Sequence, residues 1–329
     1  MPATSTLSRN DRLIGGVVYR TCTSVHHTEG DRELPRTNEL FYHRPNGNID
    51  VWCRECVRTY NREQRRKRAA GRVTRRSVTA RKFGVEMEFY GDRDLLIREM
   101  RNRGVTCNAE GYNHQVRSAW KVVTDGSVYG GWELVSPPLA GVNGMDQLRK
   151  ACEALAAANC TVQRSCGLHV HHDCSDLDAR ALGRLFRSWH RAQAAIDQLV
   201  APSRRRSQWA RPLSDAEVAN VEALPNTRPE TVRSQFRFVD RYRALNVACY
   251  PRQGTIEVRQ HQGALNFAKI SAWVEFGQAL ITKATGDADL ADFTTAETLI
   301  DDLAGHGLAA EQVTYLKGRA SYFASRVAA

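Results

Sequence analysis

Four stretches of the 329-residue sequence combine strict alternation of apolar and polar residues with side chains that can do chemistry. In residues 83–90, Glu86 and Glu88 fall on one face of an expected strand, and the opposite face is apolar. Two like charges side by side are tolerated if their face is solvated or if a cation lies between them. The pattern recurs in three more stretches, whose polar residues are Glu133, His169 and His171, and Thr255, Glu257, Arg259 and His261. If these strands form one curved sheet, its concave face gathers all of these side chains.

The residue types on this predicted face indicate metal and phosphate chemistry. Carboxylates suit Mg²⁺ or Mn²⁺, and a histidine ligand favours tolerance of Mn²⁺. The planar guanidinium of Arg259 suits phosphate oxygens, and no lysine falls on the proposed faces. Together they are typical of a phosphoryl-transfer site without a glycine-rich loop. The sequence has no Walker A or G-x-G-x-x-G motif, and no H-E-x-x-H or G-x-S-x-G motif of zinc proteases and serine hydrolases.

The elements expected to position these residues form an α+β body. Alternation and turn residues predict strands at 83–90, 119–124, 131–136, 166–172, 242–249 and 254–261. Apolar periodicity predicts helices at 93–103, 144–158, 177–200, 266–284 and 310–327. Asp176 is a candidate N-cap for the third helix, and residues 203–232 are interpreted as an irregular insertion that could act as a mobile flap. Because strands and helices do not alternate regularly, we expect an antiparallel sheet rather than a doubly wound one.

Six motifs in order resemble the amidoligase family, which is related to glutamine synthetase and glutamate–cysteine ligase. They are Gly84-Val-Glu-Met-Glu-Phe89, Asp125-Gly-Ser127, Glu133-Leu-Val-Ser-Pro137, Gly167-Leu-His-Val-His171, Arg243-Ala-Leu-Asn246, and Thr255-Ile-Glu-Val-Arg259 through Gly263-Ala-Leu-Asn266. The resemblance covers residues 81–285 and implies a curved antiparallel sheet that forms a funnel with flanking helices, as in glutamine synthetase. ATP would enter at one end of the funnel and the substrates at the other.

The resemblance also implies a reaction. A substrate carboxylate attacks the γ-phosphate of ATP to give an acyl phosphate, and an amine then displaces phosphate to form an amide. The residues implied to hold the metal ions and the triphosphate are Glu86, Glu88, Glu133, His169 and Glu257. Arg259 would stabilise the phosphoryl group during transfer.

The remaining matched residues are implied to orient substrates. Arg243 and Asn246 would orient the nucleotide or the substrate carboxylate, although an ideal strand puts them on opposite faces. Asp125 and Ser127 lie in an expected turn and would bind the amine or another substrate. His171 and His261 are candidates for supporting positions behind the metal ligands.

The first part of the chain carries a second candidate metal site. Cys53 and Cys56 form a C-x-x-C pair before an expected helix, which is a common half of a zinc site. Cys22 with His26 would supply the other half, with His27 or His43 as alternatives to His26. The segment resembles the zinc-ribbon segments attached to phage and bacterial nucleases, but those usually have a second C-x-x-C where this chain has Cys22. The other cysteines are scattered and do not suggest a disulfide scaffold.

Positive charge is concentrated just after this site. Residues 54–82 hold 12 Arg or Lys against two Glu, so they contribute +10 of the net charge of +11. A zinc module followed by such a segment matches the electrostatic footprint of a phosphate-backbone binder, and we expect contact with DNA, RNA or a ribosomal surface. The segment lacks the broad apolar face of a membrane-binding helix.

These observations predict four regions and a cytoplasmic protein. The regions are a zinc-ribbon-like module at 1–60, a basic helix and linker at 57–80, a catalytic body at 81–285 and a helical extension at 286–329. No stretch approaches the ~18 apolar residues of a membrane span, and the N-terminus lacks the apolar core of a secretory signal.

Two alternatives to the ligase remain open from the sequence. The chain could bind nucleic acid with a ligase-like body that has lost activity, or it could be a hydrolase whose Glu and His face activates water. The sequence does not name the carboxylate or the amine, which leaves amino acids, peptide or protein termini, cell-wall peptides and modified nucleobases.

Overall fold

The computed structural model describes residues 7–25, 27, 31–44, 48–61, 80–126, 128–225, 229–236, 240–286 and 293–327. The chain divides into two compact units, residues 1–72 and 73–329. Three predictions fall outside the described residues, namely those on His26, on Ser127 and on most of the basic helix and linker (62–79). Within the described ranges, no helix is both long and apolar enough to cross a bilayer.

The first unit is built from short strands. An antiparallel sheet holds β1 (Asp11–Ile14), β2 (Val17–Thr21) and β3 (Glu33–Pro35). A hairpin holds β4 (Phe41–His43) and β5 (Ile49–Cys53), and residues 54–61 are helical. The buried side chains that cluster here are Cys22, Phe41, Cys53 and Cys56.

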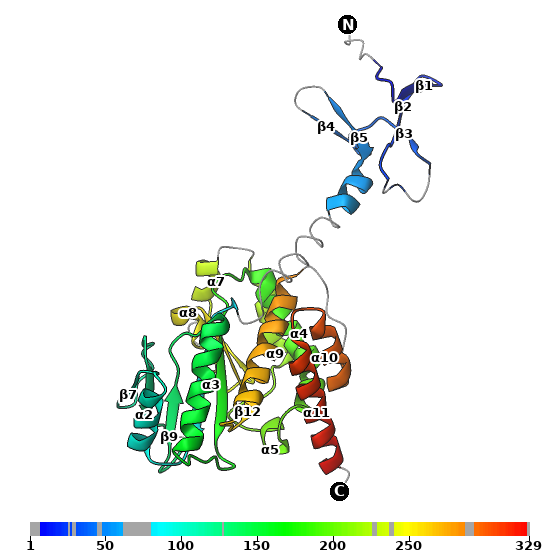
Figure 1. Cartoon of the computed structure of the whole chain (residues 1–329). Helices are drawn as coiled ribbons and strands as arrows, with labels where there is room; N and C mark the ends of the chain where they lie inside the picture. The colour runs from blue at the N-terminus through cyan, green and yellow to red at the C-terminus, as the bar shows by residue number, and fades with distance from the viewer. Residues whose placement is uncertain are drawn as a thin grey trace. The chain divides into compact units, whose positions relative to one another are not determined.

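A seven-stranded sheet forms the centre of the second unit, in the order β11-β12-β10-β6-β9-β8-β7. Figure 1 labels three of its strands, β7, β9 and β12. Its strands are β6 (Phe83–Phe89), β7 (Cys107–Ala109), β8 (Trp120–Val123), β9 (Trp132–Val135), β10 (Gly167–Asp173), β11 (Leu245–Asn246) and β12 (Thr255–Gln262). Neighbours are antiparallel except β7 and β8, which run parallel because residues 110–119 carry the chain back before β8 starts. The predicted purely antiparallel sheet is therefore wrong at this edge. The sheet is mixed and does not close on itself.

Helices cover the apolar face of this sheet. Those of the second unit are α2 (Arg93–Asn102), α3 (Gly141–Ala157), α4 (Ala179–Asp197), α5 (Pro202–Arg205), α6 (Asp215–Glu222), α7 (Pro229–Ser234), α8 (Tyr250–Gln253), α9 (Phe267–Thr285), α10 (Ala296–Ala304) and α11 (Ala310–Val327). Helix α9 is buried along most of its length because it packs against β10 and against α3, α4, α10 and α11. One core cluster joins these helices to the apolar residues of the sheet, such as Val85, Met87 and Val170. The predicted α+β class is confirmed.

The predicted elements match the structure closely, with three corrections. The predicted strand 242–249 shortens to β11, because α8 follows it almost at once. The N-cap of α4 is Asp178, whose carboxylate accepts from the Ala181 N–H, whereas the predicted cap Asp176 pairs with Arg81. The predicted irregular insertion 203–232 contains helices α5, α6 and α7, and α6 packs on α4 through buried apolar side chains.

Candidate active site

Strand register brings the predicted polar residues together on the face of the sheet opposite the helices. Glu88 of β6 lies opposite Glu133 of β9, and Glu86 lies opposite His169 of β10. Farther along the sheet, His171 and Asn246 both lie opposite Glu257 of β12. Four glutamates from three strands thus form one row, which we call the acidic row: Glu133, Glu88, Glu86 and Glu257.

His169 lies in the middle of the acidic row. Its Nδ1 is 3.4 Å from Glu86 Oε2 and 3.5 Å from Glu257 Oε1, and its Nε2 is 3.9 Å from Glu88 Oε1. Glu88 also accepts a 2.6 Å hydrogen bond from the backbone N–H of Gly167. Glu88, Glu257 and His169 are each about 95% buried, so their charges are poorly screened by water.

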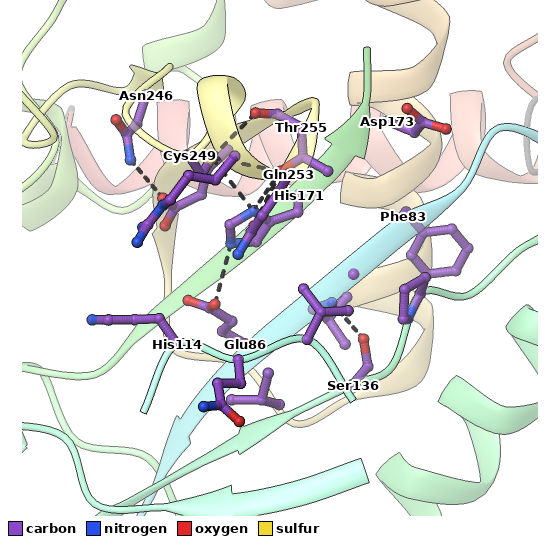
Figure 2. A pocket seen from close by; sticks show the side chains of 18 of the residues that line it. Phe83, Glu86, His114, Ser136, His171, Asp173, Asn246, Cys249, Gln253 and Thr255 are labelled. Carbon is purple, nitrogen blue, oxygen red and sulfur yellow. Dashed lines mark hydrogen bonds and ion pairs between the residues drawn. The ribbon is translucent and has the colours of Figure 1, made fainter. Parts of the chain in front are cut away.

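Glu86 and His171 form an ion pair on adjacent strands, with His171 Nε2 3.2 Å from Glu86 Oε1 (Figure 2). Burial alone would raise the pKa of Glu86, but the His171 and His169 imidazoles hold that pKa well below its ordinary value. Burial alone would likewise lower the pKa of His171, but the Glu86 carboxylate raises it well above its ordinary value. One carboxylate of the row is therefore neutralised by a protonated imidazole.

The environment of Glu133 shifts its pKa in the direction opposite to that of Glu86. Burial, together with repulsion from Glu86, Asp125 and Glu88, raises its pKa well above the ordinary value. Lys121 lines the same cavity, and its amine donates to the backbone carbonyls of Asn113 and Gln115. Burial and neighbouring carboxylates thus both act against the charged form of Glu133, which is an environment that a bound metal ion stabilises.

Glu257 is held from two sides. The Asn246 side chain donates a 2.6 Å hydrogen bond to its Oε2, and the Arg259 guanidinium pairs with its Oε1. The Nε of Arg259 also donates to the carbonyl of Trp209 at 3.3 Å. Both carboxylate oxygens of Glu257 and the direction of the Arg259 guanidinium are therefore fixed by neighbouring groups.

Two cavities lie on either side of the acidic row. The smaller, of about 530 Å³, is lined by Glu86, Glu133, His171 and Glu257, and Figure 2 shows Asn246 and Cys249 on its wall. The larger cavity, of about 1070 Å³, is lined by Glu88 of the acidic row and by Asp125 and His169. Arg241 and Arg259 line both cavities. The acidic row is therefore the wall between two chambers, and Arg259 stands at their boundary.

Three overlapping groups among the described residues of the row could each hold a metal ion. They are Glu88 with Asp125 and Glu133, Glu86 with Glu133 and His169, and Glu86 with His171 and Glu257. In each group the three ligand atoms lie within 4.8 Å of one another. An octahedral Mg²⁺ with bonds of about 2.1 Å separates its ligands by roughly 3.0–4.2 Å. Small side-chain movements would therefore let the groups bind such an ion, and His171 would also have to lose its proton to become a ligand.

Two predicted residues lie elsewhere. Arg243 lines neither cavity and pairs with Glu217 of α6 at 2.7 Å, so within the described residues it has no contact with the acidic row. His261 is not on the polar face, because a β-bulge breaks the alternation of β12 and places it opposite Leu168. Its ring packs on Trp273 of α9, and burial lowers its pKa to about 3.

Lys121 and Arg204 are among the cationic residues at the site that were not predicted. Lys121 of β8 lies opposite Val135 on the polar face, on a strand outside the four for which no lysine was expected. Its amine donates to Asn113 Oδ1 at 2.8 Å and to the Gln115 carbonyl at 2.9 Å, so it holds a segment that lines the smaller cavity. Arg204 is buried in the larger cavity and donates to the Arg259 carbonyl at 2.8 Å. Its place in an Arg-Arg-Arg run was the only signal in the sequence.

The cysteines predicted to bind zinc lie together in the first unit. Cys22, Cys53 and Cys56 are all buried, and the histidine beside them is His27. His43 is exposed on β4 and is not part of this group.

Comparison with protein-family models settles the family. The model described as "Putative amidoligase enzyme" matches residues 79–281, which is more than half of the chain. The chain belongs to this amidoligase family. The matched region begins just before β6 and ends within α9, so it contains the whole acidic row and both cavities. A search of curated proteins found no match. Family membership supports a ligase-like enzyme, and the details of its chemistry come from the geometry of the site.

Proposed function

We propose that this amidoligase is an ATP- and Mg²⁺-dependent carboxylate–amine ligase that works through an acyl phosphate. The observation that carries the proposal is the acidic row, with two imidazoles and Arg259, standing between two cavities. A ligase of this kind must bring a triphosphate and a carboxylate, both anionic, into contact. Concentrated carboxylates suit that task only if cations lie between them and the substrates.

The donor sets of the row fit Mg²⁺, with Mn²⁺ as an alternative. Carboxylate oxygens dominate all three candidate groups, and only two of the groups add an imidazole. Glu133 belongs to two of the groups and Glu86 to two, so neighbouring ions would share ligands. When bound, the ions would supply charge neutralisation for the triphosphate.

The larger cavity is proposed to take the nucleotide. Arg164, Arg204 and Arg241 line it and suit phosphate oxygens. Trp209 and Tyr242 form an edge-to-face pair on its wall, with ring centroids 5.0 Å apart, and Trp209 is about half exposed. Such exposed rings offer a stacking surface for an adenine base.

The first step would take place at the boundary of the two cavities. An oxygen of the substrate carboxylate attacks the γ-phosphorus of ATP, the bond to the bridging oxygen breaks, and ADP leaves. Arg259, which lines both cavities, is placed to stabilise charge on the transferred phosphoryl group. Glu257 and the Trp209 carbonyl hold its guanidinium in place before substrates arrive.

The second step would take place in the smaller cavity. The amine nitrogen attacks the acyl carbon, phosphate leaves, and the amine proton passes to a carboxylate of the wall. Asp173, Glu86 and Glu257 would attract a protonated amine, and Lys82 and Arg252 would attract a carboxylate. The volume of this cavity suits an amino acid or the end of a peptide.

Trapping of the acyl phosphate tests the proposal. Purified protein is incubated with Mg²⁺-ATP, hydroxylamine and pools of carboxylates, and hydroxamate and phosphate are measured. Hydroxamate that requires both ATP and one carboxylate is the expected result. A protein that neither binds ATP nor releases phosphate with any pool would overturn it, and ATP-independent cleavage of an amide would favour a hydrolase.

A second activity is proposed for the basic segment, residues 54–82. Its charge of +10 favours binding to a nucleic-acid backbone. Binding of labelled single- and double-stranded DNA and RNA at increasing salt tests this. A steep fall in affinity with salt is expected, and no binding at low salt would contradict the proposal.

A further inference from the structure

Four potential ligands converge in the first unit, from segments far apart in the chain. Cys22 directly follows β2, Cys53 ends β5, Cys56 lies in the helical residues 54–61, and His27 lies between β2 and β3. One ligand atom from each lies within 4.8 Å of all the others. The group shares no residue with the acidic row of the second unit.

The distances in this group match those around a tetrahedral zinc ion. Cys22 Sγ is 3.8 Å from Cys56 Sγ. His27 Nδ1 is 3.4 Å from Cys56 Sγ and 3.7 Å from Cys53 Sγ. Tetrahedral bonds of about 2.3 Å to sulfur and 2.05 Å to nitrogen place two sulfurs ~3.8 Å apart and a sulfur and a nitrogen ~3.5 Å apart. The ligand atoms therefore already surround a position where Zn²⁺ would fit.

A disulfide or a site for a hard cation fits this group less well than zinc does. A disulfide requires sulfur atoms about 2.05 Å apart, and it would leave a third thiol and an imidazole beside it. The Cys53 N–H donates to Cys22 Sγ at 3.2 Å, an arrangement that supports a metal-bound thiolate from outside. Three sulfurs and one ring nitrogen are also a soft set, which favours zinc over Mg²⁺ or Ca²⁺.

The rest of the first unit gives a reason for a metal. Within its described residues, the buried hydrophobic cluster consists of the three cysteines and Phe41, with a few partly buried neighbours. With so few buried apolar side chains, a small unit is usually stabilised by a metal, a disulfide or a partner. The cysteines that fill the centre of the unit would contribute far more stability as ligands than as packed thiols.

We propose that Cys22, His27, Cys53 and Cys56 bind one structural Zn²⁺ ion, and that this ion holds the first unit folded. Four protein ligands leave no open position, which is typical of structural rather than catalytic zinc. The histidine ligand is His27 rather than the exposed His43. The proposal is independent of the ligase activity.

Metal analysis of the full-length protein tests the site. About one zinc per chain is expected after purification without chelator. The paired substitution Cys53→Ser with Cys56→Ser, and the single substitution His27→Ala, should each lower bound zinc about tenfold or more. Cys160→Ser in the second unit, His43→Ala and His26→Ala should leave it unchanged. Zinc that stays bound in the Cys53 and Cys56 variant, or a wild-type protein that takes up none, would overturn the proposal.

Two further readouts do not depend on whether the variants fold. Co²⁺ exchanged into the wild-type protein should show thiolate-to-metal charge transfer and the strong visible bands of a tetrahedral ion, whereas weak octahedral bands would contradict the ligand set. Removing zinc with a chelator should speed hydrogen exchange in β1–β5 and leave β6–β12 unchanged. Unchanged exchange in β1–β5 after zinc removal would contradict the structural role.

Discussion

His171 and His172 are neighbours on β10, yet they lie in opposite environments because successive side chains of a strand point to opposite faces. His171 faces the cavity and pairs with Glu86, which raises its pKa well above the ordinary value despite its burial. His172 faces α9, where burial, with Arg81 and His171 nearby, lowers its pKa to about 3. Neither ring nitrogen of His172 has a hydrogen-bond partner among the residues that the structure describes.

This contrast holds for the two faces of the whole sheet. On the helix-covered face, burial keeps His172 and His261 neutral near pH 7 and both rings pack against α9, so changes there should affect stability. On the cavity face, charged side chains are crowded around two cavities, so changes there should affect ligand binding and turnover. The difference shows how one sheet can separate folding from function, and the following substitutions test that separation.

The largest expected effect is that of Arg259→Ala on the cavity face. Loss of the guanidinium at the cavity boundary should lower ATP-dependent hydroxamate formation by roughly 10³-fold, because that charge would stabilise the phosphoryl group in transfer. The variant should still unfold cooperatively, at a somewhat lower temperature because the buried Glu257 loses its Arg259 partner. Arg149→Ala on α3, which removes a half-exposed arginine, is the matched control. Comparable loss of activity in both variants would argue against a role for Arg259 in transfer.

On the helix face, Gly277→Ala should reduce stability without reaching the site. A Cβ at Gly277 would lie 2.4 Å from His172 Nε2, so α9 or the ring must move. The free energy of unfolding should fall by about 1–3 kcal/mol, as for other overpacked cores. Gly318→Ala on α11, where nothing lies within 4 Å, should instead raise it by up to about 1 kcal/mol. Urea denaturation measures both, and equal stability of the two variants would contradict the packing argument.

The pH dependence of stability should have opposite signs for the two faces. The folded-state pKa of His172 and of His261 is lowered to about 3, so the unfolded chain binds more protons as pH falls below 6.5. The stability that these two histidines contribute is fully present above pH 6.5. It is lost towards pH 3, and the free energy of unfolding falls by up to ~1.4 kcal/mol per pH unit for each histidine. The contribution of His171, whose pKa is raised, is complete below pH 6.5 and is lost as pH rises.

Urea denaturation between pH 7 and pH 5 measures how steeply the free energy of unfolding changes with pH. His261→Gln should make the loss of stability towards pH 5 less steep, by up to ~1.4 kcal/mol per pH unit, because one ring that stays neutral in the fold is gone. The same slope in the His261→Gln variant and in the wild-type protein would show that this ring is not held neutral.

The smallest expected effect is that of Lys121→Met. Its amine holds Asn113 and Gln115, which line the smaller cavity, so its loss should loosen that wall. We expect KM for the carboxylate or amine to rise about tenfold, with kcat changed less, since charged hydrogen bonds are worth roughly 1.5–3 kcal/mol. Lys150→Met on α3 is the control, and an unchanged KM for Lys121→Met would show that the segment is held by other contacts.

Much of this arrangement could be predicted from the sequence because period-two alternation is a strong signal. It predicted the correct faces for Glu86, Glu88 and His169, and the apolar face of β6. Alternation fails where a strand is irregular. The bulge in β12 places His261 on the apolar face, whereas alternation predicted the polar face.

The remaining differences depend on tertiary contacts that no local pattern encodes. Lys121 could be placed at the site only once the pairing of β8 with β9 was known. Arg204 reaches the larger cavity because α5 packs beside β12, and nothing in an arginine run distinguishes the buried member from the others. Asp178 caps α4 two residues after the predicted cap, which is an ordinary error at helix ends.

Metal binding by the cavity face tests the central claim most directly, because it requires no knowledge of the substrate. Mn²⁺ is titrated into the protein in the presence of ATP, and the free ion is followed by electron paramagnetic resonance, with zinc kept bound in the first unit. The wild-type protein should bind Mn²⁺, and Glu133→Gln, which alters two of the three candidate groups, should weaken binding about tenfold or more. The exposed Glu153→Gln on α3 should bind as the wild type does. Equal Mn²⁺ affinity in the Glu133 variant and the wild type, or no binding by the wild type, would contradict a metal-dependent site on this face.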